Sequence, residues 1–336
     1  MKIVELLNRA YGDRLPLLPD DRDYAAALEE TAQQYIAGQV YEELKAQGRL
    51  KDVPAFFLAS LIELRNAQSV LNLVLKAEGD RVVAALDDRG IPAMVLKGAR
   101  LSERLYGNAG VRSTSDIDLL VKPEDLLAAG EIVRALGYES LPPDRKSPYH
   151  TEFTMPMPAG GLDFHVELHW HLVKPDFFRL DCLPLWERAT RVAPYGRVYE
   201  LSAADLFYTL CLHGAKHGMS SLKHVLDIVA ALRRYPDEIE FEPLLARAQA
   251  EDTYGMVVMC LSVVYRLFPL LHRRKFFGSC RNWFPWNQRL AWKRVEGYAP
   301  FRGGFAYYVQ RTIFELAKYD RNRYRARYLR ELAFQK

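Results

Sequence analysis

The chain has 336 residues, of which 49% are hydrophobic and 26% are charged, and its formal net charge is only +4. This balance excludes a fibrous or disordered chain, and the length favours two or three structural units. No apolar run approaches the ~20 residues that cross a bilayer, and the N-terminus lacks the apolar segment and cleavage site of a secretory signal, so we expect a cytoplasmic protein.

The first quarter of the chain is expected to be helical. Apolar residues recur at helical spacing from Leu58 onward, and we assign residues 1–87 to an N-terminal helical region. The pattern changes at Gly90, where the short apolar run IPAMVLKG predicts a buried strand. A helix-like stretch follows at residues 99–107.

Further strands are expected after this helix. Residues 116–121, DIDLLV, have the β-branched and leucine content of a strand. Residues 123–136 begin with Pro-Glu-Asp, which suits a helix because carboxylates are stabilised near its positive end. Two more runs, at 150–157 and 162–170, flank a Pro-Ala-Gly-Gly turn signal and predict a hairpin.

Helical patterns return at Ser202, a candidate N-cap with Asp205 three residues later. The predicted fold class is therefore α/β (α+β), a mixed sheet with flanking helices between N- and C-terminal helical regions. The expected regions are 1–87 (helical), 88–175 (sheet) and 176–336 (helical, with a basic aromatic tail).

The charge is concentrated in the tail. Residues 272–336 contain 16 Lys and Arg against 4 Asp and Glu, a net charge of +12, whereas the preceding residues carry −8. Such a segment attracts anionic partners such as phosphates, nucleic acid or lipid headgroups. Its aromatic residues, Trp283, Trp286 and Trp292 among them, fit stacking on nucleic acid; the tail's apolar residues equally fit the buried stripe of a terminal helix.

Two acidic residues of the second strand carry the chemistry. Because side chains alternate along a strand, Asp116 and Asp118 project from one face while Ile117 and Leu119 point to the core. Two carboxylates about 7 Å apart offer the oxygen ligands that Mg²⁺ prefers, with phosphate and water completing the shell. The pattern is short, so solvated aspartates at a strand end are the alternative interpretation.

Three neighbouring features favour the metal interpretation. Lys97-Gly98 ends the preceding strand and puts a cation beside a residue that lets backbone amides approach a phosphate. Arg112 and Ser115 lie in the polar turn before the acidic pair, where a guanidinium can bind a triphosphate. The later strand DFHVELHW has four ionisable residues on one face: Asp163, His165, Glu167 and His169.

These residues, in this order, resemble the DNA polymerase β type nucleotidyltransferase superfamily. The resemblance spans roughly residues 55–260 and is closest to bacterial nucleotidyltransferase-like proteins with LKG, DIDLLV and a strand that ends in acid-Leu-His-Trp. The residues that carry it are Lys97-Gly98, Arg112, Asp116-Ile-Asp118 and Glu167-Leu-His169-Trp170.

The resemblance implies that residues 88–175 are a catalytic core that transfers a nucleotide from an NTP, such as ATP, to an acceptor hydroxyl. The acceptor would be a small molecule, a peptide or protein, or RNA. Asp116, Asp118 and Glu167 would be catalytic and bind two Mg²⁺ ions, or Mn²⁺, with Asp163 as the alternative third carboxylate. The nucleotide-binding residues would be Lys97, Gly98, Arg112, Ser115 and His169.

One feature departs from the superfamily pattern. Its turn usually reads Gly-Gly or Gly-Ser, whereas this chain has Gly98-Ala99, which removes the usual serine contact to phosphate. The departure keeps open a second hypothesis, a nucleotide-binding module of the same fold without turnover. A third hypothesis is a His-rich metallohydrolase that uses His165, His169, His213 and His217.

Overall fold

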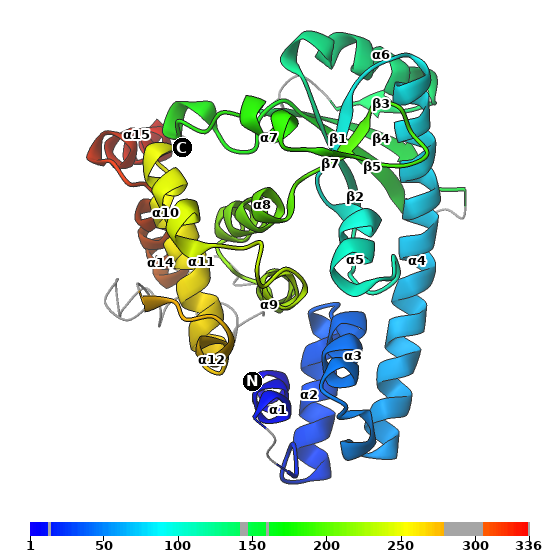
Figure 1. Ribbon diagram of the computed structural model, residues 1–336, viewed down its shortest axis with the longest axis vertical. Helices are drawn as coiled ribbons and strands as arrows, with labels where there is room; N and C mark the ends of the chain where they lie inside the picture. Colours follow the sequence, from blue (N-terminus) through cyan, green and yellow to red (C-terminus); the bar gives the residue numbers. More distant parts are fainter. Residues whose placement is uncertain (13–14, 142–146, 159–160, 279–304, 335–336) are drawn as a thin grey trace. The chain divides into compact units, whose positions relative to one another are not determined.

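The structure, a computed structural model, describes residues 1–12, 15–141, 147–158, 161–278 and 305–334 (Figure 1). Trp283, Trp286 and Trp292 of the basic tail lie outside the described residues. Contacts divide the chain into two compact units. The helical unit consists of residues 1–62, 176–180 and 207–336, and the sheet unit consists of residues 63–175 and 181–206.

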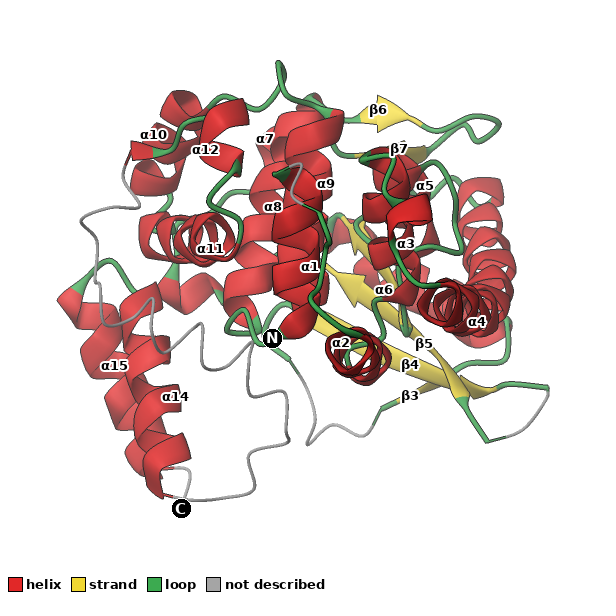
Figure 2. Cartoon of the chain, turned by 90° about the horizontal axis from the view of Figure 1, so that it is seen from below, coloured by secondary structure: helices red, strands yellow, loops and turns green. Residues whose placement is uncertain are grey.

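The sheet unit is built on a mixed sheet whose strand order is β3-β4-β5-β2-β1-β7-β6. Figure 2 shows β3, β4 and β5 side by side at one end of this order. β2 is parallel to β5, and β1 is parallel to β7; the other described pairs are antiparallel. The strands are β1 (Ala93–Val95), β2 (Asp116–Val121), β3 (Glu139–Ser140), β4 (His150–Pro156), β5 (Asp163–His169), β6 (Thr190–Arg191) and β7 (Val198–Glu200). This mixed sheet with its helices confirms the predicted fold class.

The longer strands lie where the sequence pattern predicts them. β2 occupies DIDLLV, and β4 and β5 form the expected hairpin, in register from His150 opposite His169 to Pro156 opposite Asp163. Residues 159–160 of its turn are outside the described residues. β3, β6 and β7 were not predicted, because strands of two or three residues are too short to show a period-2 pattern.

One face of the sheet carries the core of this unit. Apolar side chains of β2, β4 and β5 pack there with α4 (Ala55–Asp88) and α6 (Leu126–Ala135). The buried residues include Val82, Val83 and Leu86 of α4, Ala129 and Val133 of α6, and Ile117, Leu119, Phe153, Val166 and Leu168 of the strands. The remaining helices of the unit are α5 (Gly98–Tyr106), η2 (Pro123–Asp125) and α7 (Leu183–Glu187). Strand alternation leaves the other face to the acidic residues.

The helical unit has a largely apolar interior. α11 is almost entirely buried, from Gly255 to Leu267 with Arg266 as the exception. The helices with residues in this unit are α1 (Lys2–Tyr11), α2 (Asp21–Gln33), α3 (Ala37–Ala46), η1 (Leu50–Asp52), residues 55–62 of α4, η4 (Pro175–Phe177), α8 (Ala203–Lys216), α9 (Leu222–Arg234), α10 (Phe241–Ala250), α11 (Tyr254–Leu267), α12 (Leu271–Arg274), α14 (Phe305–Lys318) and α15 (Asn322–Phe334). The Ser202 hydroxyl accepts a hydrogen bond from the Asp205 amide (3.2 Å), which confirms the predicted N-cap of α8. Among the described residues, no helix is both long and apolar enough to span a membrane.

Part of the basic tail is neutralised within the helical unit. Asp320 accepts hydrogen bonds from the amides of Tyr254 and Gly255 at the start of α11 (2.7 and 2.6 Å). Arg321 Nε lies 2.6 Å from Asp252, which is 2% exposed. Arg327 pairs with Asp176 at 2.6 Å. The ion pairs of Arg321 and Arg327 reduce the positive charge that the tail offers to a partner.

Candidate functional site

Three carboxylates come together on two adjacent strands. The parallel register of β2 and β5 puts Asp118 opposite Glu167 and Asp116 opposite His165. Neighbouring strands lie about 4.8 Å apart, and side chains two residues apart share a face. The structure therefore brings Asp116, Asp118 and Glu167 together on the face of the sheet opposite the core.

Asp118 lies at the centre of the site and is neutralised by two side chains. Its carboxylate is 4% exposed, and its Oδ1 atom lies 2.7 Å from Lys97 Nζ and 3.2 Å from His169 Nε2. Burial alone would raise the pKa of Asp118, but the Lys97 charge and the His169 hydrogen bond outweigh it and hold the pKa well below its usual value. Asp118 is therefore a buried, ionised acceptor.

His169 bridges two of the carboxylates. Its Nε2 also lies 2.9 Å from Glu167 Oε2, and its side chain is 5% exposed. Burial would lower the pKa of His169, but the hydrogen bonds to Asp118 and Glu167 raise it overall. Burial would raise the pKa of Glu167, and the His169 hydrogen bond brings it below its usual value. The bridge favours an imidazolium that donates from Nε2.

Asp116 is the carboxylate whose charge is least compensated. Burial raises its pKa, and the negative charge of Asp118 raises it further. The Ser115 hydroxyl donates a hydrogen bond to Asp116 Oδ2 at 3.0 Å, which offsets part of this effect. The negative charge of Asp116 would therefore stabilise a cation bound beside it.

The turn before α5 places backbone beside the acidic strand. Gly98 has φ +76°, a left-handed conformation that L side chains rarely adopt, and a Cβ there would lie 3.5 Å from the Asp116 carbonyl oxygen. A small cavity of about 30 Å³ opens beside the turn. Its polar lining is Lys76, Asp80, Lys97, Arg100, Thr114, Asp116 and Asp118.

Arg112 and Asp163 occupy different positions from the carboxylate cluster. Arg112 is 3% exposed in the turn before β2, and its Nη1 donates to the Ser113 carbonyl oxygen at 3.4 Å. Asp163 is exposed at the first position of β5, two residues before the position opposite Asp116. Of the two candidates for the third carboxylate, Glu167 is the one beside Asp118 in the register.

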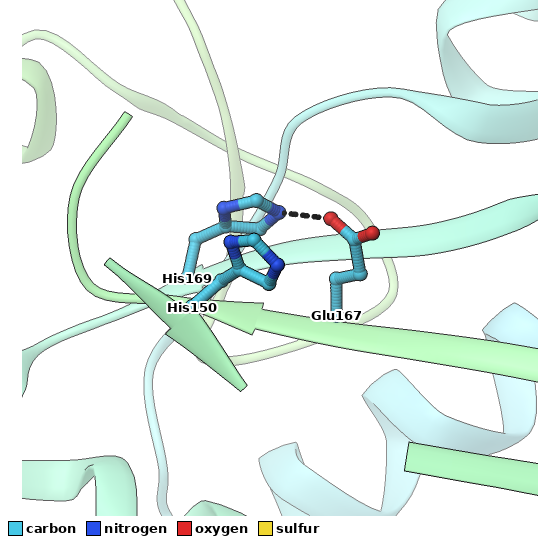
Figure 3. Close-up of side chains that lie close together, drawn as sticks. All are labelled: His150, Glu167 and His169. Atoms are coloured by element: carbon cyan, nitrogen blue, oxygen red, sulfur yellow. Dashed lines mark ion pairs between the residues drawn. The ribbon is translucent and has the colours of Figure 1, made fainter. Parts of the chain in front are cut away.

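Two residues of β4 belong to the same surface and were missed from the sequence. The hairpin register puts Glu152 opposite Glu167 and His150 opposite His169. One ligand atom each of His150, Glu167 and His169 all lie within 4.8 Å of one another (Figure 3). His150 Nε2 also lies 3.1 Å from Glu152 Oε1. The predicted hairpin already contained the signal, because its four-residue turn fixes position 150 opposite position 169.

Two cations near the cavity were also missed. Arg100, in the first turn of α5, donates from Nη2 to Asp80 Oδ1 at 3.0 Å, and Lys76 Nζ lies 2.6 Å from the other oxygen of Asp80. Both basic side chains line the cavity beside Asp116 and Asp118. The spacing of Arg100, three residues after Lys97 on a short helix, is the sequence feature that points to it.

The histidines of the metallohydrolase hypothesis belong to both units. His165 and His169 lie on β5 in the sheet unit. His213 and His217 lie in the helical unit, where they cluster with His224; the ring centroids of the three are 4.5 to 5.3 Å apart. Within the described residues, the one group whose donor atoms meet the spacing of a metal site is His150, Glu167 and His169.

The strand with Asp116 and Asp118, its parallel neighbour with Glu167 and the preceding glycine turn define the class as nucleotidyltransferase-like. Residues 20–269 match the family described as uncharacterised nucleotidyltransferase, and the chain belongs to this family. A crystal structure of an antigenic nucleotidyltransferase-like protein from Paracoccidioides brasiliensis is similar at 16% identity and a TM-score of 0.38, over 62% of this chain and 90% of that one. No curated protein matches the chain.

Proposed function

We propose that the protein is a Mg²⁺-dependent nucleotidyltransferase that moves a nucleoside monophosphate from an NTP, such as ATP, to an acceptor hydroxyl. The observation that carries the proposal is the register of β2 and β5, which groups Asp116, Asp118 and Glu167 on one surface. Membership of the family supports the same class of reaction. The catalytic core would be residues 88–175, completed by β7 beside β1.

The donor set fits a hard divalent ion. Asp116 has a raised pKa because it is buried beside two other carboxylates, and oxygen ligands are those that Mg²⁺ and Mn²⁺ prefer. We assign one ion to Asp116 and Asp118, and a second to a site that includes Glu167. When bound, the ions would neutralise the triphosphate and lower the pKa of the acceptor hydroxyl.

The side chains of the site would do the remaining work. Lys97, once released from Asp118, would bind a phosphate oxygen at the glycine turn, assisted by the amide of Gly98. Arg112, Ser115 and His169 are the further residues that we assign to the nucleotide. Glu167 would accept the proton of the acceptor hydroxyl, whose oxygen attacks the α-phosphorus in line while the bond to pyrophosphate breaks.

The acceptor would be a small molecule, a peptide or protein, or RNA, each of which can supply a hydroxyl nucleophile. The basic tail would contribute to binding if the acceptor is anionic. Arg323 and Arg330 of α15 are exposed and are the residues we assign to that contact.

A nucleotide-binding module without turnover is the second candidate. The observation that favours it is the neutralisation of Asp118 by the protein's own Lys97 and His169, an arrangement that is complete without an ion. Such a module would bind an NTP and release no pyrophosphate. The metallohydrolase hypothesis would instead require a metal-dependent release of product with no label transferred to an acceptor.

The test is a transfer assay with NTPs labelled either at the α- or at the γ-phosphate, in Mg²⁺ and with candidate acceptors or cell extract. The proposal expects α-label on the acceptor, pyrophosphate release, and a loss of at least about 100-fold in Asp116→Asn and Glu167→Gln. Asp163→Asn is the matched control on β5 and should keep its activity. Equal α-labelling by wild type and Asp116→Asn would remove the carboxylates from the mechanism, and binding without pyrophosphate release would select the inactive module.

A further inference from the structure

We infer that His150, Glu167 and His169 form a binding site for one zinc-like transition-metal ion, distinct from the Mg²⁺ site that we assign to Asp116 and Asp118. The ligands come from the two strands of the hairpin, one histidine from β4 and the other two residues from β5. Figure 3 shows the two imidazole rings beside each other, with that of His169 directed at the Glu167 carboxylate.

The spacing of the donor atoms supports this assignment. Donors that bind one zinc ion at about 2.1 Å lie roughly 3.0 to 3.4 Å from one another. His169 Nε2 lies 2.9 Å from Glu167 Oε2, just below this range. The donor atoms of the three residues all lie within 4.8 Å of one another, a separation that side-chain rotation can reduce around one ion.

The chemistry of the ligands selects the ion. Imidazole nitrogen binds Zn²⁺, Co²⁺ or Fe²⁺ far better than Mg²⁺, which prefers an all-oxygen shell. Two imidazoles and one carboxylate therefore favour a borderline metal at the β4–β5 end, whereas Asp116 and Asp118 offer oxygen alone. The adjacent surfaces would hold two different ions.

The surroundings of the histidines resemble those of bound ligands. The side chains of His150 and His169 are 11% and 5% exposed, so an ion between them would be shielded from water. Glu152 lies 3.1 Å from His150 Nε2 and orients that ring, as carboxylates beside metal-binding histidines do.

If the protein transfers nucleotides, this ion would be the second metal of that reaction, so its catalytic role rests on the proposed function. Binding of the ion to the protein does not depend on that function. The test uses full-length protein stripped of metal, in millimolar Mg²⁺, titrated with Co²⁺ and followed by its visible absorption spectrum. We expect one Co²⁺ per chain, bound at least about tenfold more weakly by His150→Gln. Asp116→Asn should keep the ion, because it lies outside this ligand set, and so should His165→Gln, the control histidine on β5.

A second measurement covers the case in which a variant fails to fold. In wild-type protein labelled with ¹⁵N-histidine, Zn²⁺ should shift the imidazole nitrogens of two residues, and either substitution at 150 or 169 should remove one signal. Absence of bound Co²⁺ in the wild type, loss of the ion in Asp116→Asn, or equal weakening by His150→Gln and His165→Gln would each overturn the inference. Nucleotide transfer without Co²⁺ binding would leave the proposed function intact, and Co²⁺ binding without transfer would leave the metal site intact.

Discussion

Lys97 and Asp118 form an ion pair on the site face of the sheet, with 2.7 Å between Nζ and Oδ1 and side chains 19% and 4% exposed. The lysine ends the connection after β1, and the aspartate is the third residue of the neighbouring β2. The pair therefore holds the glycine turn of Gly98 against the acidic strand. It also supplies the positive charge that allows Asp118 to remain ionised when buried.

Replacement of Lys97 by methionine should destabilise the metal-free protein by about 3 kcal/mol, because it leaves a buried carboxylate with half of its compensation. Urea unfolding in EDTA at pH 7 measures this loss. Lys122→Met, just after the opposite end of β2, removes a lysine that forms no ion pair within the described residues and whose Nζ lies 6.0 Å from the centre of the Trp186 ring. It should change the free energy of unfolding by less than about 1 kcal/mol. Equal effects of the two substitutions would contradict the role of the pair.

Asp116→Asn should have the opposite effect on stability. The pKa of Asp116 is raised by burial and by the charge of Asp118, so its ionised form is disfavoured in the folded protein at pH 7. A neutral amide of the same size removes that repulsion, and we expect a gain of about 1 kcal/mol in EDTA together with the loss of nucleotide transfer. Thermal unfolding gives the first quantity and the transfer assay the second. Asp163→Asn, an exposed residue, should change neither; a less stable Asp116→Asn would argue against the repulsion.

The strands of the site were predictable because their patterns are local. β2 reads as two acids alternating with apolar residues, and β5 alternates ionisable and apolar residues over its whole length. The choice of Asp116, Asp118 and Glu167 needed nothing beyond those alternations and the resemblance. Their shared surface is a property of the parallel register of β2 and β5, which joins segments about fifty residues apart and leaves no trace in either segment.

The remaining features of the site depend on contacts that no local pattern encodes. Lys97 was expected to neutralise a phosphate, and its position against Asp118 depends on the turn after β1 and on the pairing of β1 with β2. The positions of His150 and Glu152 could have been predicted, because the hairpin turn expected from the sequence puts them opposite His169 and Glu167. The short strands β6 and β7 extend the sheet beyond β1, which itself has only three residues, and segments of this length carry no pattern that predicts a strand.

Glu78 of α4 links the helix to the sheet core and should make stability depend on pH. Tyr138 Oη donates to Glu78 Oε1 at 2.7 Å, and Arg81 Nε donates to the same carboxylate. Burial would raise the pKa of Glu78, but Arg81 and Tyr138 lower it overall. Because the folded pKa is depressed, the stabilisation is fully present above the unfolded value of about 4.3 and is lost as the pH falls through the folded value.

The measurement is the free energy of unfolding of wild type and Glu78→Gln across pH 3 to 7. We expect a deficit of about 1 kcal/mol in the variant at pH 5 to 7, a value discounted because the Arg81 side chain is 41% exposed. The deficit should shrink below about pH 4. Glu131→Gln, an exposed residue of α6, should show no such pH dependence, and a deficit that persists unchanged at pH 3 would assign the loss to packing.

Alanine substitutions at the two ends of α5 should distinguish the effect of backbone strain from an effect on nucleotide binding. Gly98 and Gly107 have φ +76° and +75°, so alanine at either position adopts a strained left-handed conformation that costs about 1–2 kcal/mol. The Cβ of Gly98→Ala would lie 3.5 Å from the Asp116 carbonyl oxygen, whereas Gly107→Ala meets nothing within 4 Å. We expect similar losses of stability from both, but a fall of at least about tenfold in NTP affinity from Gly98→Ala alone, because Gly98 lies beside Asp116 in the turn to which we assign a phosphate. Calorimetric titration with a non-hydrolysable NTP gives the affinity, and urea unfolding gives the stability. An equal fall in affinity from Gly107→Ala would show that nucleotide binding is weakened by the loss of helix stability and not by a change in the turn beside Asp116.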